Sequence, residues 1–585
     1  MEAYMKYLFI CSVGPVQDFI ATARRSRDLW YGSWMLSELS KAVARSLGKE
    51  NLIFPSKETD INIGSKPSLS NKVLALVECE HPEEVGEKAH EAAKNQLVAL
   101  RDEAFSHIHG ELDSKTLAEE QVDDLLEFYW SAVPLKDEND YPRTRAKAEA
   151  LLSARKATRN FVQKEGNHHA KSSLDGKRES VIPEEKYPKA NAGKEEIKSK
   201  TKVLYREYGA RHGERLSGVD LMKRLGKPSE KSLIPKFHST SHYASLPFRD
   251  MLVRTLGDNV PKKMLKEMGD AYEDFIGGDI PKDDGSLFYA SRVSDFIPDS
   301  EKQEEVKGKI EKIYQGYGIK ERPSPYYALL RADGDNMGKV IDNQKSIENH
   351  QKLSKKLSDF AKGVPEIVKN YDGDVIYAGG DDILAYLPLH TTLDCISALD
   401  TAYQNAMNDF KTRDGEKTTL SAALLIAHHL TPLSDVMELS RSAEGRAKEV
   451  PNKNGLLILA SKRSGEDREI RGKMGELQAR FKKLIDFHRS NAIGKGTAYE
   501  LQKLYLDLKE IDTEALEAEA IRIIKRKHES GSREKIDKKI LEQFKEWIKQ
   551  QLPLSLLAKE MIIASLFASA LDMAEGKSTK QEKNS

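Results

Sequence analysis

The order of hydrophobic and polar positions at the start of the chain predicts a sheet covered by helices. Residues 5–13 form a continuous apolar run typical of a buried strand. A Gly-Pro turn then leads into a long helix from about residue 16 to residue 47. Strand-like runs follow at residues 52–54, 72–78 and 127–135, and a helix rich in Ala, Lys and Glu begins at residue 83. This β-α-β-β-α-β order predicts a ferredoxin-like α+β domain over residues 1–142.

A second α+β domain is predicted over residues 321–466, where strong strand patterns return. Its strand-like runs are residues 326–332, 374–378, 383–387, 420–427 and 456–460. Helical runs separate them at residues 346–371, 393–411 and 433–450. The chain shows no short-period sequence repeat, so two such halves would be a structural duplication.

The two remaining segments read as mostly helical, a middle domain over residues 143–320 and a C-terminal domain over residues 467–585. Charge changes at the first boundary: residues 101–140 carry 3 basic and 12 acidic side chains, whereas residues 143–202 carry 16 basic and 8 acidic. Solvated helix faces are the simpler interpretation, and a partner surface is the alternative. The C-terminal domain holds amphipathic runs at residues 477–488, 498–511, 514–526 and 534–551.

The composition indicates a folded protein without a strong overall field. The 585 residues include 93 Lys and Arg against 93 Asp and Glu, so net charge gives no general attraction for nucleic acid or a membrane. The longest mainly apolar, uncharged stretch near the end, Met561–Leu571, has 11 residues, whereas a membrane span needs about 20. Three scattered cysteines favour neither a disulfide framework nor a thiolate metal site. We therefore expect a cytoplasmic protein that does not use a membrane.

The sharpest chemical signal is a pair of adjacent carboxylates at a predicted hairpin. Residues 377–384 read YAGGDDIL, in which Gly379 and Gly380 permit the backbone angles of a tight turn. The turn presents Asp381 and Asp382 beside an open backbone that a phosphate can approach.

A third carboxylate follows the strand at residues 326–332. That strand ends at Asp333, and the residues that open the next helix are Gly334, Asp335 and Asn336. If the strand lies beside the hairpin, Asp333, Asp381 and Asp382 form one anionic cluster that requires cations. Oxygen ligands favour Mg²⁺ or Mn²⁺. Two such ions, about 3.5–4 Å apart, stabilise the attacking and leaving oxygens of a phosphoryl displacement.

Simpler interpretations exist for either motif alone. Gly and Asp dominate ordinary turns, so each motif could be only a turn. An EF-hand calcium loop also begins Asp-x-Asp, but its next acidic position would be Met337 and its closing Glu would be Gln344. Both motifs together, each at a strand end of one domain, favour a metal site.

The two motifs resemble the palm domain shared by nucleic-acid polymerases and GGDEF-type nucleotide cyclases. The chain as a whole resembles the large subunit of type III CRISPR effector complexes, most closely the III-B form, which is a cyclic oligoadenylate synthase. The likeness covers nearly all of the chain and rests on residues 12–20, 27–30, 331–339, 379–382, 420–428, Lys448 and 462–466.

This resemblance implies two palm domains packed face to face, joined by the helical middle and C-terminal domains. It also implies that the 3′-hydroxyl of one ATP attacks the α-phosphorus of another, which releases pyrophosphate and ends in cyclic oligoadenylates. Asp333 and Asp381 would hold two Mg²⁺ or Mn²⁺ ions, and Asp382 would be a further ligand or would activate the hydroxyl. The predicted ATP-binding positions are Gly14 in the first palm and Gly334, Asp335, Asn336, Gly379, Gly380 and Lys448 in the second.

Two of these positions carry their own alternatives. Lys448 falls where cyclase palms place a phosphate-binding lysine, although a lone helical lysine is more often a solvated surface residue. The first palm has no carboxylate pair after its opening strand, so we expect Gly14 to help bind a second ATP without metal ligands. The implied partners are other subunits of a type III complex, guide RNA and target RNA.

The chain departs from the family pattern in two places. It starts directly at the first palm strand and contains no His-Asp dipeptide, so we expect no HD-type DNase activity. Ser and Asp stand where two Cys-x-x-Cys pairs often form a zinc knuckle, at Ser172, Asp175, Ser217 and Asp220, so no zinc is expected there. Hydrogen bonds between these side chains are the alternative to a metal, and the sequence does not decide whether they form. Satisfied or exposed histidines are expected at His168, His169, His428 and His429, which lack a partner at metal-binding spacing.

Two other functional readings remain open from the sequence. A catalytically silent scaffold that organises guide and target RNA is disfavoured by the retained carboxylates, because unused clustered charges lower stability. A stand-alone cyclase that makes a dinucleotide is disfavoured by the long C-terminal helical domain, which favours partners.

Overall fold

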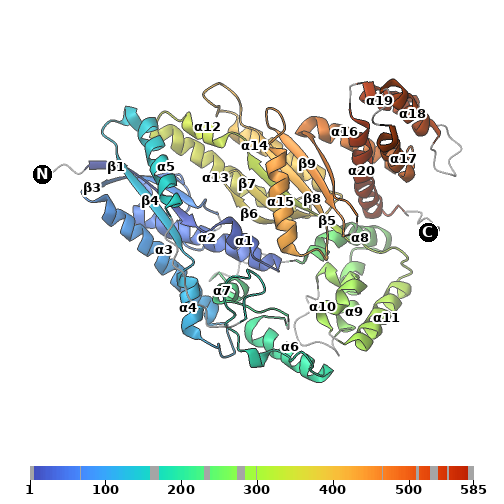
Figure 1. The fold of residues 1–585 in the computed structure, drawn as a ribbon, viewed down its shortest axis with the longest axis horizontal. Coiled ribbons are helices and arrows are strands. Elements are labelled where there is room, and N and C mark those ends of the chain that lie inside the picture. Colours follow the sequence, from blue (N-terminus) through green and yellow to red (C-terminus); the bar gives the residue numbers. More distant parts are fainter. Residues whose placement is uncertain are drawn as a thin grey trace.

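The structure is a computed structural model, and it describes residues 5–65, 68–158, 170–211, 213–228, 238–272, 283–297, 299–463, 465–508, 513–526, 538–549 and 552–577. Within these residues the strands form a four-stranded sheet near the N-terminus and a six-stranded sheet in the second half of the chain. Figure 1 shows the two sheets side by side, with helices of the middle segment below them and the C-terminal helices beside the second sheet. The predicted α+β class is confirmed.

The first sheet has the predicted β-α-β-β-α-β connectivity. Its strands are β1 (Met5–Gly14), β2 (Leu52–Phe54), β3 (Lys72–Cys79) and β4 (Glu127–Pro134), all antiparallel in the spatial order β2-β3-β1-β4. Phe9 and Val73 face the side covered by α2 (Ser26–Leu47) and α3 (Pro82–Phe105). Short helices α1 (Gln17–Ala21) and α4 (Lys115–Asp123) complete this part.

The opposite face of the first sheet is also covered. Leu8 and Ile10 of β1 cluster with Tyr141, Ala148 and Leu152 of α5 (Tyr141–Ala157), which packs against β4 and β1. The packing of this unit therefore continues past residue 142, where the sequence analysis placed its boundary.

The second sheet repeats the core of this topology and extends it. Its strands are β5 (Tyr326–Gly334), β6 (Asp374–Gly379), β7 (Asp382–Leu387), β8 (Leu420–His428), β9 (Gly455–Ser461) and β10 (Arg468–Lys473), in the order β10-β9-β8-β5-β7-β6. The run β6-β7-β5-β8 corresponds to β2-β3-β1-β4 of the first sheet. β8 and β9 are parallel, and the other neighbours are antiparallel. β10 was not predicted from the sequence, because only Ile470 of this charged segment is buried.

Helices cover both faces of the second sheet, which explains why its central strands are apolar on both sides. Leu330 and Leu424 point to one face and Leu329 and Leu425 to the other. The first face is covered by α13 (Ile347–Lys369), α14 (Thr392–Met407), α16 (Met474–Arg489) and α20 (Leu554–Ala574), and the second by α8 (Thr240–Leu256) and α15 (Leu433–Ala447). Short helix α12 (Met337–Asp342) follows β5.

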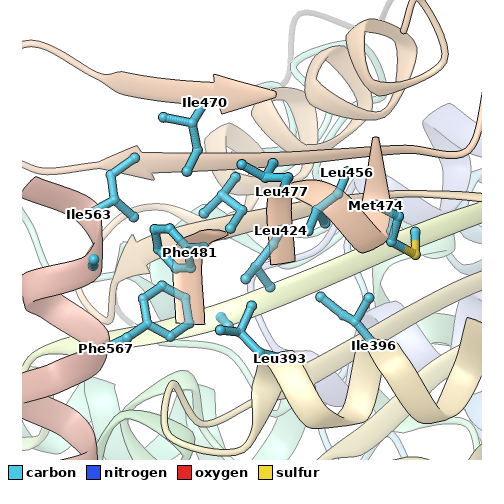
Figure 2. Packing of buried hydrophobic residues seen from close by; sticks show 14 of the residues in the cluster. Leu393, Ile396, Leu424, Leu456, Ile470, Met474, Leu477, Phe481, Ile563 and Phe567 are labelled. Carbon is cyan, nitrogen blue, oxygen red and sulfur yellow. The ribbon is translucent and has the colours of Figure 1, made fainter. Parts of the chain in front are cut away.

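The C-terminal helices pack on the second sheet through aromatic residues. Figure 2 shows Phe481 of α16 against Phe567 of α20, with Leu393 of α14 beside them. The two rings meet edge to face with their centroids 5.2 Å apart. The other helices of this segment are α17 (Lys495–Leu508), α18 (Thr513–Arg526) and α19 (Lys538–Lys549), close to the predicted amphipathic runs. In the described residues α20 alone is long and apolar enough to cross a membrane. A single such helix is weak evidence for a span, because a mostly buried core helix like this one has the same length and composition.

The middle segment is less helical than predicted. Its helices are α6 (Lys194–Tyr208), α7 (Gly218–Leu225), α8, α9 (Val260–Asp270), α10 (Val293–Phe296) and α11 (Ser300–Gly316). Described residues 170–193 form turns around one short 3-10 helix, Glu184–Lys186. In Figure 1, α6 and α7 lie beneath the first sheet, and α9 to α11 lie beneath the second.

The two sheets meet where α13 lies against β2 and where α2 lies against β6. Gln351 of α13 donates a hydrogen bond to the carbonyl of Leu52 in β2, at 2.8 Å. Arg145 of α5 forms an ion pair with Asp342, at 2.7 Å. The two α+β units therefore share a polar and apolar junction.

Candidate active site

The three predicted carboxylates meet at one end of the second sheet. β5 ends with Asp333 and the glycine after it, and β7 begins with Asp382. Ala332 pairs with Ile383 in the antiparallel register, so Asp333 and Asp382 stand next to each other where the strands end. Gly380 has a φ of +69° in the turn between β6 and β7, which confirms the predicted tight hairpin.

Asp381 lies directly against the backbone of Gly334. A Cβ atom built on Gly334 would be 2.7 Å from Oδ2 of Asp381 and 2.4 Å from the hydroxyl of Tyr403. The Tyr403 hydroxyl is itself held by the hydroxyl of Thr418, at 2.9 Å. A glycine is therefore required at position 334 for steric reasons, because any side chain would displace the carboxylate or the phenol.

Burial raises the pKa of these carboxyl groups. The pKa of Asp381 rises to about 8, first through burial and then through the negative charge of Asp333. The pKa of Asp382 rises to about 7, again through burial, although Arg331 opposes the rise. Among the described residues no side chain forms a hydrogen bond or an ion pair with Asp381 or Asp382. These two carboxyl groups are therefore available to a ligand from outside the chain.

Asp333 differs from Asp381 and Asp382 because its carboxylate forms an ion pair with a lysine. Lys448, directly after α15, forms ion pairs with Oδ2 of Asp333 and with Oε1 of Glu444, the latter at 2.8 Å. Glu444 also accepts a hydrogen bond from Nε of Arg331, at 2.5 Å. Burial lowers the pKa of Lys448, but its two carboxylate partners outweigh this effect and raise it. The structure thus places Lys448 at the carboxylate cluster and not on an isolated surface.

Glu444 and Arg331 were missed by the sequence analysis. Glu444 lies four residues before Lys448, a spacing that brings two helical side chains together. Arg331 lies two residues before Asp333, a spacing that puts two strand side chains on one face. These spacings could have identified both residues once α15 was assumed to cover that face of β5.

The side chain of Asp335 is an internal anchor. Its Oδ2 accepts hydrogen bonds from the hydroxyls of Thr419 and Ser421, at 2.7 and 2.8 Å, and from the backbone N–H of Asn454, at 2.9 Å. The Asp335 side chain is buried, so only the backbone of Asp335 could take part in the predicted binding of ATP. Asn336 precedes α12 in the left-handed region, with a φ of 58°.

The corresponding end of the first sheet is polar but different. Gly14 ends β1 opposite Glu127 of β4, whose Oε2 would lie 3.4 Å from a Cβ built on Gly14. Lys156 of α5 donates a hydrogen bond to Ser12, at 3.3 Å. The position of Glu127 beside Gly14 was not predicted, because the two residues are far apart in the chain.

The four positions expected to replace a zinc knuckle come together around Asp220. Oδ2 of Asp220 accepts hydrogen bonds from the hydroxyls of Ser172 and Ser217, at 2.6 and 2.7 Å. Asp175 is close enough to raise the pKa of Asp220, although burial is the larger cause. Hydrogen bonds therefore connect these positions, a point that the sequence had left open.

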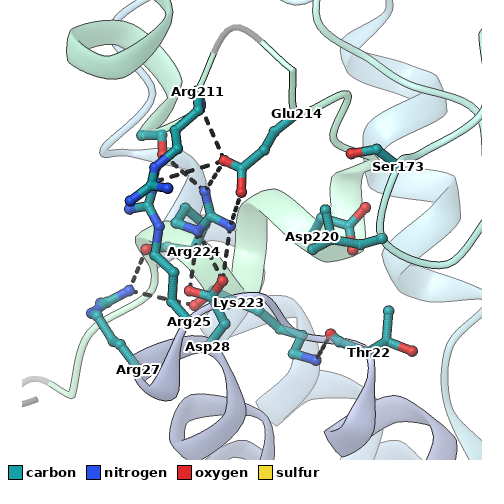
Figure 3. A network of polar contacts seen from close by, with 12 residues as sticks. Thr22, Arg25, Arg27, Asp28, Ser173, Arg211, Glu214, Asp220, Lys223 and Arg224 are labelled. Atoms are coloured by element: carbon teal, nitrogen blue, oxygen red, sulfur yellow. Dashed lines mark hydrogen bonds and ion pairs between the residues drawn. The ribbon is translucent and has the colours of Figure 1, made fainter. Parts of the chain in front are cut away.

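A buried ionic network next to this cluster joins the first α+β unit to α7. Figure 3 shows Arg224 of α7 between Asp28 of α2 and Glu214, with ion-pair distances of 2.9 Å to both. Arg27 donates to backbone carbonyls at the end of α7, including that of Arg224. Lys223 is buried and donates to the carbonyl of Phe19, at 2.6 Å. Residues 27–30, part of the family likeness, therefore attach α2 to α7.

Several of the described histidines make polar contacts within the chain. Nδ1 of His429 lies 2.7 Å from the hydroxyl of Ser241, whereas His168 and His169 lie outside the described residues. Two groups that the sequence analysis missed have ligand atoms within 4.8 Å of one another: His238, His242 and Asp284, and Asp250, Asp372 and His390. In the first group Nδ1 of His242 accepts a hydrogen bond from the backbone N–H of Gly285, at 3.2 Å. In the second, Nε2 of His390 lies 3.0 Å from Oδ2 of Asp250. These ring nitrogens therefore already have partners within the chain.

Two family models match this chain. The model of the Cas10/Cmr2 second palm domain matches residues 326–457, which contain the carboxylate cluster. The model of the N-terminal part of the CRISPR-associated protein Cmr2 matches residues 8–102, which contain the first three strands. The Cmr subunit Cmr2 of Pyrococcus furiosus is 26% identical over 542 residues, which covers 77% of this chain and 61% of the relative. The chain thus spans less than two thirds of that relative's length.

Two cryo-EM structures of the type III-B Cmr-beta complex contain a chain of similar fold. The chain in the apo state gives a TM-score of 0.66 at 13% identity, over 97% of this chain and 82% of that chain. The chain in the complex bound to cognate target RNA gives 0.63 at 14% identity, over 92% and 80%. The sequence matches and the shared fold agree: this chain is similar to Cas10/Cmr2 large subunits, with its likeness to the type III-B form.

Proposed function

We propose that this chain is the cyclic oligoadenylate synthase subunit of a type III CRISPR complex in the cytoplasm. It joins ATP molecules through 3′-hydroxyl attack on the α-phosphorus, releases pyrophosphate, and acts when target RNA binds. The observation that carries the proposal is the convergence of Asp333, Asp381 and Asp382 at one end of the second sheet. Clustered carboxyl groups with raised pKa values are typical of a catalytic site.

The residues at this site fit divalent cations. All three side chains offer oxygen, the donor that Mg²⁺ and Mn²⁺ prefer. Asp381 and Asp382 form no hydrogen bond or ion pair with another described side chain, so cation binding breaks no existing side-chain contact there. Asp333 and Asp381 are the proposed ligands, with Asp382 as a further ligand or the group that activates the hydroxyl. Two ions held there would supply charge stabilisation to the attacking and leaving oxygens.

The remaining groups of this site would bind and orient ATP. Gly379 and Gly380 leave the hairpin backbone open to a phosphate. Lys448 would contribute a positive charge to the triphosphate. At the first sheet, Gly14 with Ser12 and Lys156 would form the polar end that receives a second ATP.

The proposed partners are other type III subunits, guide RNA and target RNA. The net charge of zero favours RNA binding that depends mainly on those other subunits. The match to the Cas10/Cmr2 second palm model and the fold shared with the Cmr-beta chain, solved with cognate target RNA, support this assignment.

The decisive experiment uses α-labelled ATP with Mg²⁺ or Mn²⁺ and the assembled complex, with and without matching target RNA. We expect phosphatase-resistant oligoadenylates only with target RNA. The Asp381→Ala/Asp382→Ala variant should make none, whereas the surface variant Asp359→Ala/Asp394→Ala should match the wild type. Absence of product under either metal, from a complex that still binds target RNA, would favour the scaffold alternative.

A further inference from the structure

Arg331, Glu444, Lys448 and Asp333 form a continuous chain of opposite charges on one face of the second sheet. Arg331 and Asp333 lie two residues apart on β5, and Glu444 and Lys448 lie four residues apart at the end of α15. Because of these spacings, the two pairs face each other across the space between strand and helix. Charges therefore alternate from Arg331 to Glu444 to Lys448 to Asp333.

The contacts assign a different task to each member. Glu444 accepts from Arg331 through Oε2 and contacts Lys448 through Oε1, so each carboxylate oxygen has its own cation. The Arg331 side chain is only 9% exposed and that of Glu444 only 15%, which limits alternative positions. The Lys448 and Asp333 side chains are 27% and 25% exposed, so their end of the chain opens toward the site.

We infer that Glu444 is a positioning residue, fixed by Arg331, that keeps the Lys448 ammonium on Asp333 as a resident counter-ion when cation and nucleotide are absent. The inference rests on the proposed function for the identity of the incoming ligands. For Asp333 to hold a divalent cation, the Lys448 ammonium would have to leave it, and Glu444 would then keep Lys448 close enough to contact phosphate. Lys448 thus competes with the metal and assists the nucleotide.

This arrangement predicts effects of opposite sign from one substitution. Lys448→Met removes the competing cation, so Mn²⁺ should bind the nucleotide-free complex more tightly, by about tenfold if the displaced ion pair contributes about 1.4 kcal/mol. The same variant loses the phosphate contact, so its KM for ATP should rise. A purely structural lysine would not tighten metal binding when removed.

Glu444→Gln keeps the shape of the side chain and removes its charge. Lys448 then has Asp333 as its sole carboxylate partner in this cluster. This change opposes cation binding and leaves Lys448 unplaced for phosphate, so Mn²⁺ affinity should fall and the KM for ATP should rise. In the Lys448→Met background, Glu444→Gln should no longer change the KM, because its effect on nucleotide passes through Lys448.

The test is a four-variant cycle on the assembled complex: wild type, Lys448→Met, Glu444→Gln and the double variant. Mn²⁺ binding without nucleotide is measured by electron paramagnetic resonance, and the KM for ATP is measured separately. Glu438→Gln, an exposed carboxylate on α15, is the matched control. Asp381→Ala/Asp382→Ala shows which Mn²⁺ signal belongs to this site.

The expected result is tighter Mn²⁺ binding in Lys448→Met, weaker binding in Glu444→Gln, and no change in Glu438→Gln. Unchanged or weaker Mn²⁺ binding in Lys448→Met would overturn the inference. A KM effect of Glu444→Gln that persists in the Lys448→Met background would also overturn it. The Mn²⁺ measurements need no turnover, so they remain decisive even if the complex makes no oligoadenylate and the proposed function fails.

Discussion

The hydroxyl of Tyr141 hydrogen-bonds to Nδ1 of His350, 2.7 Å away, across the junction between the two α+β units. Tyr141 opens α5, which covers the first sheet, and His350 lies in the first turn of α13, which covers the second. Both side chains are buried. This pair therefore reports on the integrity of the junction.

We expect the junction to weaken in acid because of His350. Burial lowers the pKa of His350 to about 3, with a further contribution from Arg145, whereas the unfolded value is about 6.5. Between these values the unfolded chain binds the extra proton, so stability is full above about pH 6.5 and falls as the pH drops toward 3. At pH 5 the loss from one such histidine is about 2 kcal/mol. Thermal unfolding at pH 5 and pH 7.5 measures it.

His350→Gln is the matched variant for this prediction, because its amide can still accept a hydrogen bond from Tyr141 and does not titrate. Its Tm should depend less on pH than that of the wild type. An equal dependence would show that other groups, such as the similarly shifted His242 and His429, dominate acid unfolding.

Gly334→Ala should abolish nucleotidyl transfer, because the new methyl group would occupy space now held by Asp381 and Tyr403. Overpacking of this kind costs about 1–3 kcal/mol, so the chain should still fold. Gly338→Ala is the control, since nothing lies within 4 Å of a Cβ at that position. Activity and Tm of both variants check the prediction, and an active Gly334→Ala would contradict the geometry of the site.

Asp335→Ala and Asp381→Ala should change stability in different ways. Asp335 accepts three hydrogen bonds in the interior, and its loss leaves those donors without a partner, at a cost of about 3 kcal/mol. The Asp381 carboxyl accepts only from its own backbone N–H, and its raised pKa means that the folded cluster disfavours its ionised form, so its removal should leave the Tm unchanged or raise it. Calorimetry of the two variants measures the contrast. A fall in Tm for Asp381→Ala as large as that for Asp335→Ala would refute it.

A chelator should leave the Tm of the wild-type chain unchanged, because hydrogen bonds join the positions of the knuckle. Asp220→Ala should lower the Tm, since three donors from Ser172 and Ser217 then lose their acceptor. The variant S172C/D175C/S217C/D220C should gain zinc-dependent stability. Thermal unfolding with and without EDTA, together with bound-zinc analysis, tests both statements. An EDTA effect on the wild type would reveal a structural metal.

The sequence predicted the elements best where the hydrophobic pattern was strong. β5, β7 and β8 are buried on both faces and appear close to the expected residues. β10 was missed because it is a charged edge strand. α5 was assigned to the middle segment because hydrophobic periodicity does not reveal its contacts with β4. A helix pattern indicates an apolar face and does not identify the element that covers it.

The sequence by itself determined which carboxylates and glycines the site could use, because strand ends and the Gly-Gly turn are local features. It indicated Asp333, Asp381, Asp382 and Lys448 without deciding whether the lysine was bound or solvated. Only the tertiary structure decided that Glu444 links Lys448 to Arg331, that Asp335 turns inward, and that Asp381 rests on Gly334. The physical reason is that these contacts join β5 to α15, β8 and the hairpin, some of which lie more than one hundred residues away along the chain. The distances between such segments are set by how the sheet and its helices pack.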